Sequence, residues 1–256
     1  MKPEMKLAFS AAAFVAIILS LAVPASAASV LFEDTFTGVA DGTLLSTQSG
    51  YSNHATLPQV FKITNEQGDG TQDDAEHEAY RTWSIDGTAP QYVLSMDLVQ
   101  ESISMVIRVR GDATGGGTAN LTQFRNNQDP AGAGEFDGNA GMGNTGNSPS
   151  GVSGPVHMKW TMNASPLTIS QSLHDINTGA LLHSWGPTDI SGQIDSITDI
   201  TNIRLSSDAR GGNSTGFLFD NLKLESIPEP TTCTLLGIGL LMLFHPVMRN
   251  RVRRRG

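Results

Sequence analysis

The chain has 256 residues, and its 16 basic and 25 acidic side chains give a net charge of −9. Most of the basic residues lie near the two ends. The stretch between them, Ser29–Ile227, holds 9 Lys and Arg against 23 Asp and Glu, so its net charge is −14. A surface this acidic repels nucleic acid and other anionic polymers, whereas neutral glycans or cations are compatible with it. We therefore expect no nucleic-acid partner.

The N-terminus has the three parts of a secretory signal peptide. Lys2 and Lys6 precede an apolar stretch from Leu7 to Val23, and small residues follow the break at Pro24. We therefore expect residues 1–28 to direct the chain into the secretion machinery and to be removed, rather than to stay as an anchor.

Short apolar segments separated by Gly, Asn, Asp and Pro predict strands and turns through the middle of the chain. Ile107 and Val109 alternate with Arg108 and Arg110, and Val156–Met162 alternates in the same way, the period expected of half-buried strands. The expected strands cover residues 30–36, 60–64, 80–85, 92–99, 103–110, 156–162, 167–173, 181–185, 202–206 and 217–224.

About ten strands in about 200 residues favour an all-β, antiparallel two-sheet sandwich over residues 29–226. No convincing amphipathic helix occurs, although Ile190–Ile200 could form one helical turn. The segments Leu31–Phe36 and Gly216–Leu224 resemble the first and last strands of concanavalin A-like or laminin-G-like jelly rolls. The resemblance implies that the two ends of the domain lie close together. It leaves function open, because such folds serve as lectins, hydrolases and spacers.

Residues 111–154 interrupt the strand pattern with many Gly, Asn and Ser residues. This composition buries too little apolar area to offset the entropy of ordering. We therefore predict a long loop near 111–154.

Aromatic rings are the usual platforms for sugars, because the C–H faces of a pyranose stack on them. By alternation Trp160 belongs to the core, which leaves Trp83 and Trp185 as the candidate glycan contacts.

Glu33, Asp34 and Asp220 are candidate ligands for a structural calcium, which would join the first strand to the last. Asp220 could equally hydrogen-bond a neighbouring turn. The histidines have no ligand-like spacing and the only cysteine is Cys233, so no zinc site is expected. The acidic run from Asp69 to Glu78 is interpreted as a solvated loop, with calcium binding as the alternative.

No catalytic residue is predicted. Glu135-Phe136-Asp137 resembles part of the acidic strand of laminarinase-like glycosidases, but Ala140 stands where the second glutamate is required. The Gly-x-Ser-x-Gly pattern at 212–216 would need a helix after the serine for nucleophilic catalysis, but a strand pattern follows at once, so a hairpin turn is the better interpretation. The sequence favours a binding or structural module, with glycan as the first candidate ligand. The alternative is a secreted glycoside hydrolase or lyase.

The C-terminus combines a Pro-Glu-Pro triplet, an apolar run and a basic tail. The run over about 231–247 would form a transmembrane helix of roughly 25 Å at ~1.5 Å per residue, near the lower limit for crossing a ~30 Å hydrocarbon core. Basic residues at its end favour a cytoplasmic C-terminus. The residues expected to anchor and orient the helix are Leu235, Leu236, Leu240, Leu241, Arg249, Arg251, Arg253, Arg254 and Arg255.

This order of features over residues 227–256 resembles the PEP-CTERM sorting domain. The resemblance implies that Pro228, Glu229 and Pro230 form a recognition motif for an exosortase, a membrane enzyme of the transpeptidase type. It further implies a protein that is briefly held in the membrane and then delivered to the cell envelope, cell surface or extracellular matrix of an exopolysaccharide-producing bacterium. Exopolysaccharide is accordingly a candidate partner.

Overall fold

Alternation of apolar and polar side chains builds two antiparallel sheets that enclose one core. The computed structural model describes residues 27–53, 61–70, 77–100, 105–127, 135–140, 155–207 and 217–228. The predicted signal peptide and sorting segment lie outside these residues, apart from positions 27, 28, 227 and 228. In the described part, no helix has the length and apolar character needed to cross a bilayer.

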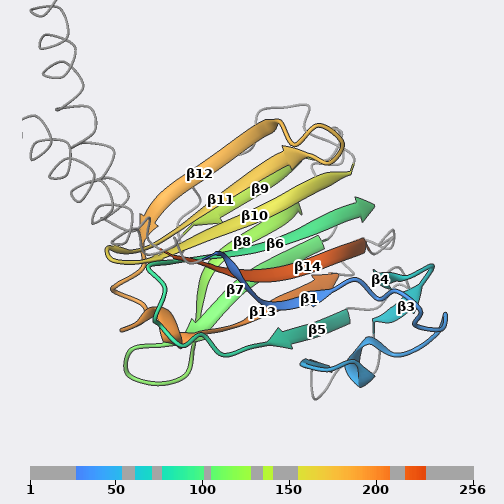
Figure 1. Ribbon diagram of the computed structural model, residues 1–256, viewed down its shortest axis with the longest axis horizontal. Coiled ribbons are helices and arrows are strands. Elements are labelled where there is room, and N and C mark those ends of the chain that lie inside the picture. Colours follow the sequence, from blue (N-terminus) through green and yellow to red (C-terminus); the bar gives the residue numbers. More distant parts are fainter. Residues whose placement is uncertain are drawn as a thin grey trace, which may run out of the picture. The chain divides into compact units, whose positions relative to one another are not determined.

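Sheet A contains eight strands in the order β12-β11-β10-β6-β14-β4-β3, with β1 also paired to β14. It lies in front of the second sheet in the view of Figure 1. Its strands are β1 (Ser29–Asp34), β3 (Lys62–Thr64), β4 (Gln67–Asp69), β6 (Gln91–Gln100), β10 (Val156–Ala164), β11 (Leu167–Asp175), β12 (Leu181–Asp189) and β14 (Leu218–Ile227).

Sheet B contains six strands in the order β2-β5-β13-β7-β8-β9. They are β2 (Tyr51–Asn53), β5 (His77–Thr82), β7 (Met105–Asp112), β8 (Thr118–Asn127), β9 (Glu135–Ala140) and β13 (Ile200–Ser207). The two short 3₁₀ helices are η1 (Leu45–Thr47) and η2 (Ile197–Asp199). The second lies within the stretch where a helical turn was predicted, and Ser196 and Asp199 form a capping box on it.

The alternation predicted for two strands is confirmed. Met105, Ile107 and Val109 on β7 are fully buried, as are Met158 and Trp160 on β10. Their inward faces meet between the sheets, where the ring of Trp160 lies 5.2 Å from that of Phe124 on β8. Burial of these inner faces fixes which side chains of each strand face outward.

The first and last strands are neighbours, as the jelly-roll resemblance implied. β1 pairs antiparallel with β14, and Ser29 lies opposite Ser226. All ten predicted strands are present with shifted ends, and the all-β two-sheet sandwich is confirmed.

The prediction of one loop over residues 111–154 is wrong where β8 and β9 form. A turn containing Gly115, Gly116 and Gly117, all at positive φ, joins β7 to β8. Strand β8 then places Leu121 and Phe124 in the core. The abundance of glycine across the whole stretch hid these few apolar residues. Residues 128–134 and 141–154 lie outside the described part.

A buried ion pair joins the two sheets. Nε of Arg81 on β5 lies 2.7 Å from Oδ2 of Asp34 on β1, and the two side chains are 10% and 18% exposed. The guanidinium carbon of Arg81 lies 4.0 Å from the ring centroid of Phe32. Gly50 is required beside it, because its φ is +80° and a Cβ would collide with the guanidinium of Arg81.

We predict that Arg81→Met lowers the free energy of unfolding by about 3 kcal/mol, because it leaves the Asp34 carboxylate buried without its partner. The double variant Arg81→Met/Asp34→Leu should recover part of this loss, since no buried charge is left. The measurement is chemical denaturation of the full chain. The control is Lys223→Met, which breaks the more exposed Lys223–Glu225 pair and should cost less than about 1 kcal/mol. Equal losses for Arg81→Met and Lys223→Met would contradict a structural role for the inter-sheet pair.

Candidate functional site

The outer face of sheet B is polar and rich in arginine. Because Ile107 and Val109 point inward, Arg108 and Arg110 on the same strand point away from the core. Neighbouring strands add further polar side chains to this face. We call this set the arginine face: Glu78 and Tyr80 of β5, Arg108 and Arg110 of β7, Asn120 and Gln123 of β8, and Asn202 and Arg204 of β13.

Strand pairing brings these residues together from distant parts of the chain. Arg204 lies opposite Tyr80 on one side and opposite Arg108 on the other. Asn202 lies opposite Arg110, which in turn lies opposite Asn120. Cross-strand neighbours have Cβ atoms about 4.5–5.5 Å apart, so the side chains form a continuous surface.

Several contacts hold the arginine face in one arrangement. Glu78, only 4% exposed, pairs with Arg204, and its Oε2 accepts a hydrogen bond of 2.6 Å from the hydroxyl of Tyr80. The Tyr80 ring centroid lies 5.5 Å from the guanidinium carbon of Arg110. Nε of Arg108 donates to Oε1 of Gln123 at 3.0 Å. A ligand would meet side chains that are already ordered, which lowers the entropic cost of binding.

The interpretation of residues 69–78 as a solvated acidic loop is wrong at both ends of the run. Asp69 ends β4 and is 6% exposed, and Glu78 lies in β5 on the arginine face. The acidic run in the sequence does not reveal that Asp69 belongs to a strand of sheet A and Glu78 to a strand of sheet B. Residues 71–76 lie outside the described part.

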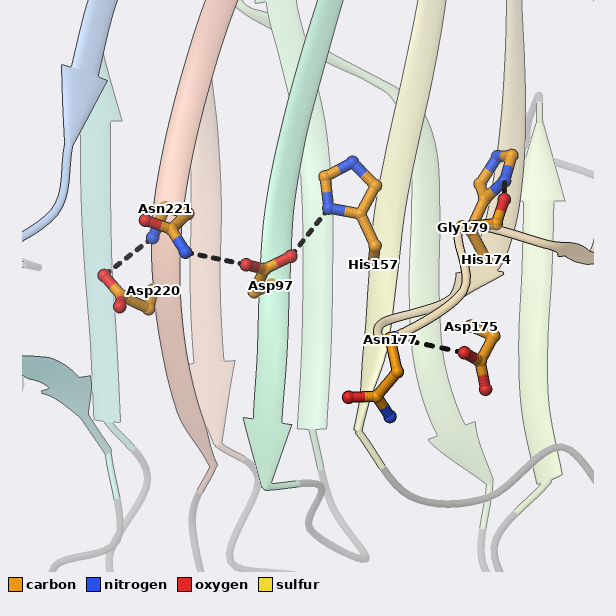
Figure 2. A network of polar contacts seen from close by, with 8 residues as sticks. All are labelled: Asp97, His157, His174, Asp175, Asn177, Gly179, Asp220 and Asn221. Carbon is orange, nitrogen blue, oxygen red and sulfur yellow. Dashed lines mark hydrogen bonds and ion pairs between the residues drawn. The ribbon is translucent and has the colours of Figure 1, made fainter.

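The outer face of sheet A carries a second polar network, centred on Asp97 of β6 (Figure 2). Nδ1 of His157 on β10 lies 2.6 Å from Oδ1 of Asp97. Nδ2 of Asn221 on β14 donates to Oδ2 of the same carboxylate at 2.7 Å. Asn221 has a φ of +52° at an irregularity in the β6–β14 pairing. Its bond to Asp97 therefore stabilises a backbone conformation that few residues other than glycine adopt.

Two carboxyl groups on this face have pKa values shifted in opposite directions. Burial raises the pKa of Asp97, but hydrogen bonds from His157 and Asn221 outweigh it, so the net shift is downward. Burial raises the pKa of Asp220, and the charges of Asp97 and Glu66 add to the increase. Opposite shifts of this kind can mark an acid–base pair.

The geometry favours a structural role for these two carboxyl groups. Both oxygens of Asp97 already accept hydrogen bonds. Figure 2 shows Asn221 lying between Asp97 and Asp220, whose Oδ1 accepts from the backbone N–H of Asn221 at 2.7 Å. Asp220 thus hydrogen-bonds the next residue of its own strand, β14, and not the neighbouring turn that was offered as its second reading. Asp220 lies opposite Asp97 in the pairing of β14 with β6, but each carboxylate already accepts a hydrogen bond.

The predicted aromatic platform is not found at Trp185. This residue is 7% exposed and packs against Phe124 and His183, with ring centroids 5.4 and 4.3 Å away. Trp185 is the one buried residue of β12, and its ring points into the sandwich toward Phe124. Trp83 is partly buried against the core, and its ring lies 5.7 Å from that of Phe32. Its contact with a glycan stays a prediction.

The predicted calcium ligands are not assembled into a metal site. Asp34 pairs with Arg81, and Glu33 and Asp34 point to opposite faces of β1 because they are consecutive. Over the described segments, no group of three or more His, Cys, Asp or Glu residues is placed to hold a metal ion. The residues present therefore do not fit the predicted calcium.

The candidate catalytic motifs have different outcomes. Glu135-Phe136-Asp137 does form a strand, β9, at the edge of sheet B. The Gly-rich pattern at 212–216 lies outside the described residues.

The sequence had already placed Arg108 and Arg110 on the solvent side of a strand. It gave no sign that Glu78, Tyr80 and Arg204 would lie beside them, because strand pairing decides this.

Comparison with known proteins shows the fold and not the family. No protein-family model matches the chain, and no curated protein matches it in sequence. The structure is similar to the CBM2 module of the evolved Dit of Lactobacillus casei BL23 phage J-1, with a TM-score of 0.51 and 11% identity over 79% of this chain and 97% of that one. It is also similar to basic winged bean lectin, solved with Tn-antigen, with a TM-score of 0.50 and 8% identity over 78% and 97%.

A lower similarity, with a TM-score of 0.45 and 12% identity, is to an endo-1,3-beta-glucanase from Streptomyces sioyaensis, covering 81% of this chain and 99% of that one. No inference about catalysis rests on it. The domain is thus a lectin-like, concanavalin A-type jelly roll by architecture, in agreement with the predicted fold.

We predict that Asp220→Asn raises the melting temperature at pH 7 by about 1–2 °C. The raised pKa of Asp220 means that its ionised form destabilises the folded state above the unfolded-state pKa of about 3.9. A rise of this size in the melting temperature corresponds to roughly 0.5 kcal/mol, which is typical of a surface interaction. The gain should vanish as the pH falls below about 4.

The matched variant Asp97→Asn should have the opposite sign. The lowered pKa of Asp97 means that its carboxylate stabilises the folded state at pH 7, and that this stability is lost as the pH falls through the folded-state pKa. Thermal melts of both variants between pH 3 and pH 8 provide the measurement. The same sign for both variants at pH 7 would show that the two carboxyl groups are not held in opposite environments.

Proposed function

We propose that this protein is an exported glycan-binding module, and that the arginine face of sheet B is its binding surface. The observation that carries the proposal is the ordered chain of contacts from Arg204 through Glu78 and Tyr80 to Arg110. Polar groups held ready on one face of a sheet suit a ligand rich in hydroxyl groups.

The aromatic and amide side chains of this face supply the two contacts that sugars need. The ring of Tyr80 is half-buried and offers apolar area. Arg108 and Gln123 offer hydrogen-bonding groups on the neighbouring strands. The fold is shared with a carbohydrate-binding-module-type domain and with a lectin, and this supports the proposal at the level of architecture.

Export and sorting complete the proposed function. The N-terminal residues 1–28 have the layout of a signal peptide, and Pro228, Glu229 and Pro230 precede an apolar run and five arginines. We infer that an exosortase processes the chain near this motif and delivers the sandwich to the cell surface or extracellular matrix. Exopolysaccharide is then the nearest glycan.

The alternative function, a secreted glycoside hydrolase or lyase, needs converging acid and base groups. The best-ordered carboxylates on the two outer faces are Glu78 and Asp97. Glu78 is paired with Arg204 and Tyr80, and Asp97 is bonded to His157 and Asn221. Because Glu78 and Asp97 are already held by these partners, binding is favoured over hydrolysis.

We predict that Tyr80→Ala weakens glycan binding at least about five-fold, because a stacked aromatic ring contributes roughly 1 kcal/mol or more beyond the area it buries. The measurement is a glycan array followed by calorimetry with the full chain purified in detergent. His174→Ala removes a ring from the outer face of sheet A and should leave the affinity unchanged. Equal effects of the two substitutions would exclude the arginine face as the site. Release of shorter oligosaccharides from a bound glycan would support the hydrolase instead.

We predict that the mature protein lacks the arginine tail. Mass spectrometry of the protein from its native host should find no peptide from residues 249–255. Replacing Pro228 and Pro230 with alanine should retain the intact C-terminus, because the proposed recognition motif is lost. An intact C-terminus in the unaltered protein would contradict processing by an exosortase.

A further inference from the structure

Arg110 differs from the other two arginines of the arginine face in its partners. Arg204 pairs with Glu78, and Arg108 donates to Gln123. In the part of the chain that the structure describes, the contact of the Arg110 guanidinium is with the ring of Tyr80, and no carboxylate pairs with it. A positive charge without a carboxylate partner is thus held in place on this face.

The surroundings of Arg110 make this unpaired charge costly. The side chain is half-buried, and a cation removed from water without an anion loses hydration energy. The contact with Tyr80 offsets part of this loss through its ring quadrupole. The cross-strand neighbours Asn120 and Asn202 are neutral, and Nε of Arg110 itself is buried without a hydrogen-bond partner. An anionic ligand would supply the missing compensation.

We propose that Arg110 selects glycans that carry carboxylate groups, that is, polymers of uronic acids. This inference rests on the proposed function of the arginine face as a glycan-binding surface. A planar guanidinium binds a carboxylate through two parallel hydrogen bonds, which a neutral hydroxymethyl group cannot reproduce. The Tyr80 ring, fixed by its hydrogen bond to Glu78, holds the guanidinium in position for this contact.

The acidic character of the domain does not prevent such binding. The net charge of −14 over Ser29–Ile227 acts at long range, where salt screens it beyond about 8 Å at physiological ionic strength. Three of the nine basic residues of this stretch, Arg108, Arg110 and Arg204, share one sheet face. Glu78 offsets one of these charges through its pair with Arg204, which leaves Arg108 and Arg110 as the excess positive charge among the residues of the arginine face.

The test compares acidic glycans with their neutral counterparts. Calorimetry with the full chain in detergent measures binding of galacturonate, mannuronate and glucuronate tetrasaccharides and of the same compounds after reduction of their carboxyl groups. The variants are Arg110→Gln, which removes the charge, and Arg110→Lys, which keeps the charge but lacks the planar guanidinium group. Lys159→Gln makes the same change in charge on β10 of sheet A. Thermal melts confirm that each variant is folded.

We expect at least one uronate tetrasaccharide to bind roughly 10- to 100-fold more tightly than its reduced form, the range for a charge-assisted hydrogen-bonded pair. Arg110→Gln should abolish this preference, Arg110→Lys should reduce it, and Lys159→Gln should preserve it. Equal binding of acidic and reduced glycans would overturn the inference but leave the proposed function standing. A preference that survives Arg110→Gln would overturn the role of Arg110. Binding of neither set would overturn both.

Discussion

Burial of the two inner sheet faces is the constraint on which the rest of the structure depends. The ring centroids of Trp160 of sheet A and Phe124 of sheet B lie 5.2 Å apart, and both residues are fully buried. Because successive side chains of a strand point to opposite faces, fixing the inner residue fixes its neighbours on the outside. Arg108 and Arg110 therefore point away from the core as a consequence of packing Ile107 and Val109. The proposed binding surface and the core follow from one alternation.

The domain places its few cations in two different environments. Arg81 joins the sheets through Asp34 at 2.7 Å, where it acts in stability. On the arginine face, Arg204 pairs with Glu78, whereas Arg110 meets an aromatic ring and two amide-bearing neighbours. Since a charge is retained at a half-buried position only when something compensates it, the contrast between the paired arginines and Arg110 is the strongest indication of a ligand. The Asp97 network on the opposite sheet stabilises the irregularity at Asn221 instead.

Sequence periodicity predicted most of the strands and little of the site. Segments with clear alternation, such as Val156–Met162, were placed correctly because a period of two needs no tertiary information. Strand β8 was missed because its apolar residues Leu121 and Phe124 lie among glycines and asparagines. Trp185 was chosen as a sugar platform from its residue type alone. Its burial depends on contacts with Phe124, some sixty residues earlier in the chain.

By itself, the amino-acid sequence determined the all-β class, the positions of ten strands, the closeness of the two ends of the domain, and the outward direction of Arg108 and Arg110. These properties follow from local alternation and from the resemblance of the end strands to a known architecture. Only the tertiary structure decided that Glu78, Tyr80 and Arg204 lie beside those arginines and that Asp34 pairs with Arg81. The physical reason is that strand order and register bring distant residues together, and neither is encoded in any single segment.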